Sequence, residues 1–269
     1  MKDFKYLIEN FFTHKDFLAP ADQLPGTLFT PLHIVFAVLL LAVIIVLAIV
    51  VSKRSEKTIK TIFIVLWALC TGLEIFKIIW ESVSGRVVAL SVGGILPLYI
   101  CSVYMYAMPL AIWGKGVVKK IGCGYVCTLG FIGALANFIY PVNVVSRYSV
   151  ISFAGMHTMF FHGIMLFTFL VMLISGYHRY TKVTKWYELL LPSVAVLVVS
   201  IPANLVNYLY GADYMFFKGN FFPISIALGS LPDWAATIIM YIAYIVICAL
   251  FYLPSFIKNK RKKHTQVIA

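Results

Sequence analysis

Residues 32–51 read LHIVFAVLLLAVIIVLAIVV, a run that contains no Asp, Glu, Lys or Arg. An α-helix needs about 20 apolar residues to cross the hydrocarbon core of a bilayer, so this stretch predicts a membrane-spanning helix. It is not a cleavable signal peptide, because it is too long, begins some 30 residues into the chain and has its positive charges on the wrong flank.

Six further apolar runs of similar length follow the first. They lie at residues 61–80, 95–113, 121–140, 153–176, 186–208 and 234–256. The chain is 62% hydrophobic and 12% charged, about half the charged share of a soluble protein. The sequence therefore predicts an all-α, polytopic membrane protein with about seven transmembrane helices. Its expected parts are an extracytoplasmic or interfacial segment (1–30), a seven-helix transmembrane domain (31–257) and a basic cytoplasmic tail (258–269).

Basic residues between the apolar runs predict the orientation. The segments after the first, third, fifth and seventh runs hold Lys53, Arg54, Lys57, Lys60, Lys115, Lys119, Lys120, Arg179, Lys182, Lys185, Lys258, Lys260, Arg261, Lys262 and Lys263. The other side holds Lys2, Lys5, Lys15, Arg86, Arg147 and Lys218. Because cytoplasmic loops are enriched in Lys and Arg, we expect the N-terminus outside and the C-terminus in the cytoplasm. This distribution argues against a nucleic-acid partner despite the net charge of +12.

Two segments outside the runs are unusually apolar. Phe4, Leu7, Ile8, Phe11 and Phe12 recur at helical spacing, which predicts either a short helix in the outer interface or an apolar terminus without fixed structure. Residues 211–233 carry many aromatic side chains, and we expect them to lie in the interface or to fold back over the helices.

Polar residues within the runs or directly beside them gather at the predicted outer ends. They are Glu74, Lys77, Glu81, Tyr99, Cys101, Ser102, Asn137, His157, His162, Asn204, Asn207 and Asp233. Ionisable residues in a membrane are costly and often functional, so we interpret the set as lining a polar cavity open to the outer leaflet or the extracytoplasmic space.

Each of these residues also has a purely structural interpretation. Glu74 and Lys77 could form an ion pair that holds helices together, and asparagines often hydrogen-bond between membrane helices. His157 and His162 lie five positions apart, about 140° around a helix, so they cannot both point at one spot. One would line the cavity while the other packs elsewhere.

A cysteine beside a histidine permits nucleophilic catalysis. The imidazole takes the thiol proton, and the thiolate attacks a carbonyl group to form a thioester. Cys101 has the right position, with His162 or His157 as the base, and an asparagine could stabilise the oxyanion. The five cysteines all lie in apolar runs, which makes a chance pairing common. Their spacing predicts no disulfide framework and no zinc site, so no metal or cofactor is expected.

Several other protein classes are excluded. The last run contains no lysine to carry a retinal, and the chain has no GxSxG, P-loop or HExxH motif. Matched broken helices in two symmetric halves, which would favour a transporter, are not evident.

Residues 96–102 read LPLYICS, and a second proline follows at Pro109. This pattern resembles the LPLxxC signature of the YwaF-like bacterial integral membrane proteins, which are related to the eukaryotic transmembrane-protein-164 acyltransferases. Further matches follow in the same order, at Asn137 within ANF, at His162 within FFH, at Asn207 before Tyr208, and at residues 213–216. The resemblance covers most of the chain from about residue 30 onward.

The resemblance implies seven spans in a bacterial plasma membrane and acyl transfer between membrane lipids through a cysteine. Cys101 then matches the nucleophile, and His162 matches its partner better than His157 does. Tyr99 and Asp213 depart from residues common in the family, at positions where His and Asn are expected. The first hypothesis is an acyltransferase that acts on outer-leaflet phospholipid through a Cys101 thioester. Its expected substrate-binding residues are Glu74, Lys77, Tyr99, Asn137, Asn204 and Asn207.

Two alternatives use the same cavity. A non-enzymatic transporter or ligand-binding protein would need Glu74 and Lys77 but not Cys101. A lipid hydrolase would use the same nucleophile with water as the acceptor. In every case the expected partners are membrane lipids, and the sequence leaves the oligomeric state open.

Overall fold

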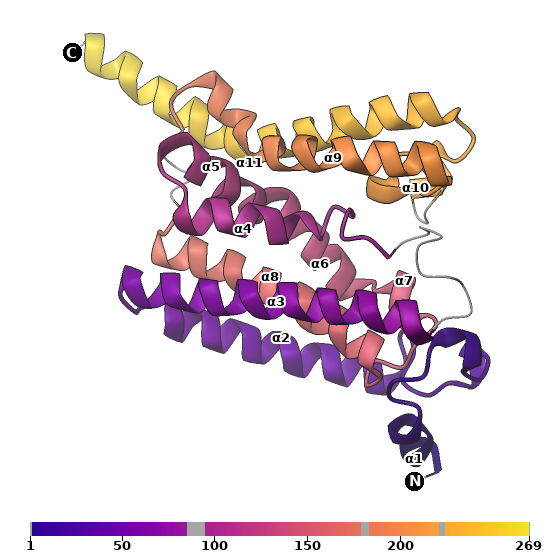
Figure 1. Cartoon of the computed structure of the whole chain (residues 1–269). Coiled ribbons are helices and arrows are strands. Elements are labelled where there is room, and N and C mark those ends of the chain that lie inside the picture. Colours follow the sequence, from indigo (N-terminus) through magenta and orange to yellow (C-terminus); the bar gives the residue numbers. More distant parts are fainter. Residues whose placement is uncertain (1, 85–94, 179–182, 221–223, 269) are drawn as a thin grey trace. The chain divides into compact units, whose positions relative to one another are not determined.

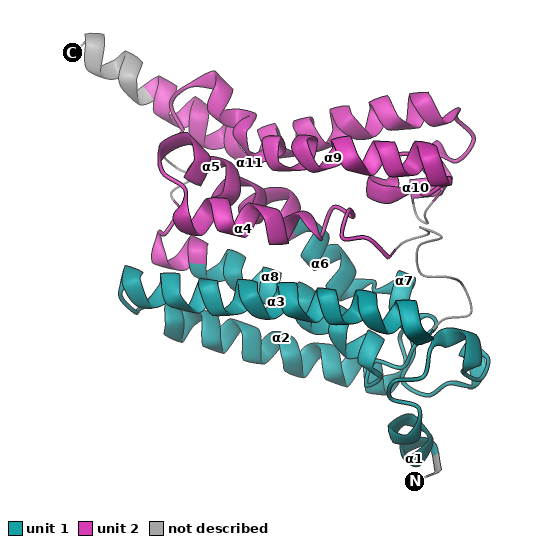
Figure 2. Ribbon diagram, viewed as in Figure 1, with its two compact units in different colours: residues 1–91, 132–171 teal, residues 92–131, 172–269 magenta. Residues whose placement is uncertain are grey.

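The computed structural model describes residues 2–84, 95–178, 183–220 and 224–268 (Figure 1). These residues are mostly helical and contain no β-strand, which confirms the all-α prediction. Arg86, Arg179, Lys182 and residues 221–223, which entered the predictions above, lie outside the described residues. The chain forms two compact units, one of residues 1–91 and 132–171 and one of residues 92–131 and 172–269, here called unit 1 and unit 2 (Figure 2).

Six helical segments are long and apolar enough to cross a membrane. They are Pro31–Ser52, Glu56–Ser84, Gly116–Val145, Phe153–Ser175, Leu191–Tyr210 and Asp233–Arg261. Each contains most of one predicted run. The chain is therefore a multi-pass membrane protein, and its surroundings include membrane lipids.

The remaining run, residues 95–113, is not one continuous helix. Its second half forms the short apolar helix α4 (Val103–Trp113), while residues 95–102 form turns. Pro97 explains the break, because proline lacks a backbone N–H and disfavours helical backbone in the residue before it. A helix of this length spans roughly 16 Å, about half of the hydrocarbon core. The orientation with the N-terminus outside requires this segment to cross, and it stays a prediction.

Unit 1 is built around α8. Its helices are α1 (Lys2–Glu9), η1 (Lys15–Phe17), η2 (Ala21–Gln23), α2 (Pro31–Ser52), α3 (Glu56–Ser84), α6 (Phe131–Ile139), α7 (Val142–Val145) and most of α8 (Phe153–Ser175). A Cβ added at Gly163 on α8 would lie 3.0 Å from Ile44 of α2 and 3.9 Å from Phe138 of α6. The absence of a side chain at Gly163 therefore lets these helices approach closely.

The N-terminal segment is ordered and packs onto unit 1. The indole N–H of Trp80 donates to the carbonyl of Phe12 at 2.8 Å, and Phe11 packs against a buried cluster that includes Trp80 and Phe153. Leu7 of α1 is buried, whereas Phe4 and Ile8 are exposed. Of the two interpretations of this segment, the structure shows the short helix, which ends at Glu9, before Phe11 and Phe12. Its place in the interface stays a prediction.

Unit 2 has α5 at its centre. It comprises α4, α5 (Gly116–Tyr125), the π-helical turn η3 (Val126–Gly130), η5 (Trp186–Leu189), α9 (Leu191–Tyr210), η6 (Tyr214–Phe216), α10 (Ile224–Leu228) and α11 (Asp233–Ile268). Helix α5 packs against α4 and α9, and α11 packs against α9 and η3. The segment after α9 folds back over these helices as predicted, since Tyr244 and Thr237 of α11 donate to the carbonyls of Met215 and Phe217.

Gly122 marks the closest approach of α5 to α4. A Cβ added there would lie 2.4 Å from the backbone nitrogen of Ala111 and 2.5 Å from the carbonyl oxygen of Ala107. We expect Gly122→Ala to lower the free energy of unfolding by about 1–3 kcal/mol, because the backbones would have to separate. Denaturant unfolding in micelles, followed by circular dichroism, measures this.

The matched control is Gly72→Ala on α3, where a new Cβ meets nothing within 4 Å. That change should be neutral or stabilising by up to about 1 kcal/mol, since alanine favours helix. Equal losses for both variants would contradict close packing at Gly122.

Candidate functional site

The turn that carries Cys101 is held by tyrosine hydroxyls. The hydroxyl of Tyr214 accepts from the N–H of Leu96 at 2.9 Å. Tyr125 donates to the carbonyl of Ile100, and Tyr106 donates to that of Pro97 at 3.3 Å. Non-helical backbone at membrane depth needs partners of this kind, because its polar groups lack the bonds of a helix. We call residues 95–102 the Cys101 turn.

Cys101 differs from the other cysteines in its exposure. Its side chain is half-buried, whereas the other four, Cys70, Cys123, Cys127 and Cys248, are buried. All five are free of disulfides. A thiol reagent or a substrate therefore reaches Cys101 more readily than the rest.

Tyr99 of the same turn packs on the loop after α9. Its ring centroid lies 4.9 Å from that of Tyr214 and 6.2 Å from that of Phe216. Met215 and Phe216 both have φ of 57°, a left-handed backbone that is strained for residues other than glycine. Such strain persists only where surrounding bonds fix it, and here the Tyr244 hydroxyl bonds to Met215.

Both asparagines of α9 bond to neighbouring elements. Asn207 accepts from the N–H of Tyr214 at 2.7 Å and donates to its carbonyl at 3.0 Å. Asn204 donates to the hydroxyl of Tyr241 on α11. These bonds match the structural interpretation of the asparagines. Through Tyr214, Asn207 also supports the Cys101 turn, and a direct role of either asparagine with substrate stays a prediction.

We expect Asn207→Ala to lower the free energy of unfolding by about 1–3 kcal/mol, the usual cost of leaving buried polar groups unpaired. Asn207 is buried and its two bonds to Tyr214 would be lost. Asn204→Ala is the control, because Asn204 is only half-buried. A smaller loss for Asn207→Ala than for Asn204→Ala in denaturant unfolding would contradict this role.

Unit 1 brings three ionisable residues together inside the spans. Lys77 Nζ lies 3.1 Å from Glu74 Oε1, and His157 Nε2 lies 3.3 Å from Glu74 Oε2. The Glu74–Lys77 ion pair agrees with the structural interpretation from the sequence. Glu74 and His157 are both buried, and Lys77 is partly exposed. Asn137 of α6 lies in the same unit and is half-buried.

His162 has different surroundings from His157. Its Nδ1 lies 2.7 Å from the carbonyl oxygen of Thr158, which can only accept, so Nδ1 carries the proton. In the neutral ring, Nε2 then holds a lone pair. Nε2 is buried and has no hydrogen-bond partner among the described residues. His162 therefore has the tautomer of a general base, while His157 faces a carboxylate.

The structure adds residues that the sequence did not single out. Tyr125 and Tyr214 support the Cys101 turn from distant parts of the chain. Tyr214 lies within the family match at residues 213–216, but no local pattern marks its bond to the turn or singles out Tyr125. His14, 5% exposed, lies 3.1 Å from Glu81 and 3.0 Å from Asp16. In the sequence, His14 stands two positions before Asp16 in a largely apolar N-terminal segment, and this pattern could have predicted a contact between His14 and an acidic residue.

The predicted site residues are divided between the units. Glu74, Lys77, Asn137, His157 and His162 belong to unit 1, and Tyr99, Cys101, Asn204 and Asn207 belong to unit 2. The contact between Cys101 and His162 stays a prediction.

These features define the class of protein. It is an all-helical, multi-pass membrane protein with buried ionisable groups within its spans and a half-buried cysteine on an irregular turn. The sequence profile of the TMEM164 family matches residues 28–257, so the chain belongs to the TMEM164 family. Neither curated proteins nor solved structures gave a match. The family and the membrane helices together are compatible with a protein of membrane-lipid biology.

Proposed function

We propose that this protein is an intramembrane acyltransferase of the YwaF-like bacterial branch, acting on phospholipid or a related acyl lipid in the outer leaflet of the plasma membrane. Cys101 is the nucleophile and His162 the base. The observation that carries the proposal is the fixed tautomer of His162, whose Nδ1–H donates to Thr158 and leaves the Nε2 lone pair for a proton. Cys101 is half-buried on the Cys101 turn, and in this proposal its thiol gives its proton to His162.

The proposed reaction has two half-reactions. In the first, Nε2 of His162 takes the Cys101 proton, and the thiolate attacks the ester carbonyl of the donor lipid. The tetrahedral intermediate expels the lysolipid alkoxide, which takes the proton back from His162, and a thioester remains on Cys101. In the second, an acceptor hydroxyl gives its proton to His162 and attacks the thioester, releasing the Cys101 thiolate, which takes that proton.

The other predicted residues take supporting roles in this proposal. Asn137 is the better candidate for the oxyanion, because Asn204 and Asn207 already bond to Tyr241 and Tyr214. Glu74 and Lys77 orient the lipid headgroup through opposite charges, and Tyr99 packs beside the nucleophile as part of its wall.

A second candidate function rests on the buried group of Glu74, Lys77 and His157. Charged networks of this kind also mark substrate pathways in transporters and binding proteins. That function would leave Cys101 dispensable. A hydrolase differs from the acyltransferase only in its acceptor, so adding acceptor alcohols should divert the acyl group from water if transfer is the true reaction.

Activity-based labelling tests the proposal directly. A lipid-like thiol-reactive probe is applied to the full chain in native membranes, and labelled cysteines are located by mass spectrometry. Cys101 should label selectively, labelling should disappear in Cys101→Ser, and it should persist in the control Cys248→Ser. Equal labelling of Cys101 and Cys248 would show that Cys101 is a packing residue and would favour the transport or binding function.

A further inference from the structure

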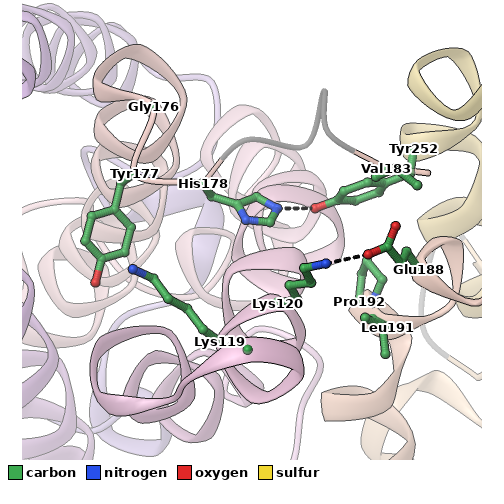
Figure 3. Close-up of a pocket in the computed structure, with 11 residues that line it drawn as sticks. Lys119, Lys120, Gly176, Tyr177, His178, Val183, Glu188, Leu191, Pro192 and Tyr252 are labelled. Atoms are coloured by element: carbon green, nitrogen blue, oxygen red, sulfur yellow. Dashed lines mark hydrogen bonds and ion pairs between the residues drawn. The ribbon is translucent and has the colours of Figure 1, made fainter. Parts of the chain in front are cut away.

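Unit 2 contains a pocket that none of the predicted site residues line. Its volume is about 520 Å³, within the range of small-molecule sites. Figure 3 shows side chains around it from α5, the turn after α8, η5, α9 and α11. They include Lys119 and Lys120, Tyr177 and His178, Glu188 and Tyr252. The sequence pattern predicts that this end of the unit faces the cytoplasm.

The pocket carries an excess of positive charge. Lys120 forms an ion pair with Glu188, whose second oxygen accepts from the N–H groups of Thr184 at 2.9 Å and Lys185 at 3.1 Å. Both oxygens of the Glu188 carboxylate therefore already have partners. Lys120 remains half exposed, and Lys119 Nζ lies 4.1 Å from the ring centroid of Tyr177. The lining of the pocket therefore holds two ammonium groups, one on Glu188 and one over Tyr177, against a single carboxylate.

The titratable groups of the pocket keep fixed charges near neutral pH. Burial and the repulsion of Lys119 and Lys120 lower the pKa of His178 to about 4, so its ring is neutral and bonds to the Tyr252 hydroxyl at 2.7 Å. Burial alone would raise the pKa of Glu188, but its hydrogen bonds with Lys120, Thr184 and Lys185 hold it at about 2. Between pH 5 and 8 neither group changes charge.

The lining of the pocket is both polar and apolar. The polar side chains are those of the lysines, His178, Glu188, Tyr177 and Tyr252, while Val183 lies next to Tyr252, and Pro192 and Leu191 lie next to Glu188 (Figure 3). A ligand with an anionic group and an organic portion suits such a lining. Lysine ammonium groups bind phosphate as point charges with several donors.

We propose that this pocket binds an organic phosphate, with the phosphate against Lys119 and Lys120 and the organic portion against Val183, Leu191 and Pro192. The phosphate belongs either to a phospholipid headgroup or to a soluble phosphate ester. This site is separate from the thiol chemistry of Cys101, and neither proposal depends on the other.

Binding to the full chain in phosphatidylcholine nanodiscs tests this proposal. One arm titrates glycerol phosphate by calorimetry, and the other adds phosphatidic acid or phosphatidylglycerol to the nanodiscs and measures retained lipid by native mass spectrometry. Saturable binding is expected in one arm, which identifies the source. Replacing either lysine with glutamine should weaken it about tenfold, the usual value of one charge-assisted hydrogen bond.

The control is Lys115→Gln, an equal charge change at an exposed lysine that does not line the pocket. Lys120→Arg keeps the charge and the Glu188 pair, so it should retain binding and shows that the fold tolerates a change there. Equal weakening by Lys115→Gln, or saturable binding in neither arm, would overturn the proposal.

The pH dependence separates phosphate monoesters from diesters. Because His178 and Glu188 stay fixed between pH 5 and 8, a change of affinity there comes from the ligand. A monoester gains its second charge near pH 6, so glycerol phosphate or phosphatidic acid should bind more tightly as the pH rises through that value. Phosphatidylglycerol, a diester, should show no such step. Affinity that falls as the pH rises would contradict the proposed phosphate contacts.

Discussion

Replacing His162 by glutamine is expected to slow acylation of Cys101 by about 10²–10⁴-fold, the usual contribution of a general base. Glutamine fills a similar volume and can still bond to Thr158, but it has no nitrogen lone pair to accept a proton. Rapid quenching and mass spectrometry of the thioester in vesicles measure the rate, with Cys101→Ala as the baseline.

The matched control is His157→Gln on the same helix. His157 faces Glu74, so its loss should change stability or lipid affinity more than the acylation rate. A greater loss of rate in His157→Gln than in His162→Gln would reverse the assignment of the base. An unchanged rate in His162→Gln would remove the basis of the acyltransferase proposal.

Glu74→Ala should lower the free energy of unfolding by about 3–5 kcal/mol, because it leaves Lys77 as an uncompensated charge within a span. His157 would lose the same partner. Denaturant unfolding of the full chain in micelles measures the loss.

Two further variants test the cause of that loss of stability. Glu81→Ala removes a carboxylate that is 23% exposed and pairs with His14 outside the buried group, so a smaller effect is expected. The double variant Glu74→Leu with Lys77→Leu should recover much of the stability, since apolar replacement of a whole buried pair is often neutral. A double variant less stable than Glu74→Ala would show that the unpaired charge of Lys77 is not the main cause of the loss.

The long apolar runs predicted six of the spanning helices, whereas Pro97 made the prediction for residues 95–113 wrong in its first half. Leu32 to Val51 lies within α2, and Thr30 caps that helix by accepting from the N–H of His33. The length of the apolar run could not show that residues 95–102 are not helical. Hydropathy measures how apolar the side chains are, whereas Pro97 acts on the hydrogen bonds of the backbone. The sign of the break was present in the sequence as the Leu-Pro-Leu triplet.

The sequence predicted contacts within one helix better than contacts between helices. An ion pair of Glu74 and Lys77 was one of the two interpretations from the sequence, and their i, i+3 spacing on one helix allows it. The approach of His157 to Glu74 depends on how α8 packs against α3, which no periodicity encodes. From the sequence, Lys119 and Lys120 were interpreted only as loop charges that set the orientation in the membrane. The carboxylate and the aromatic rings that complete their pocket lie more than 50 residues further along the chain, so the sequence did not indicate the pocket.

The tyrosine bonds of the Cys101 turn also bear on how this protein is made. The N–H of Leu96 donates to the hydroxyl of Tyr214, which lies 118 positions later in the chain. At about 5–20 residues per second, the ribosome takes roughly ten seconds to synthesise that partner. Until then the N–H of Leu96 lacks this partner, and the helix that follows it, α4, has only 11 residues. We therefore expect the insertion of this segment to depend on water or on the insertion machinery until the C-terminal half has been made.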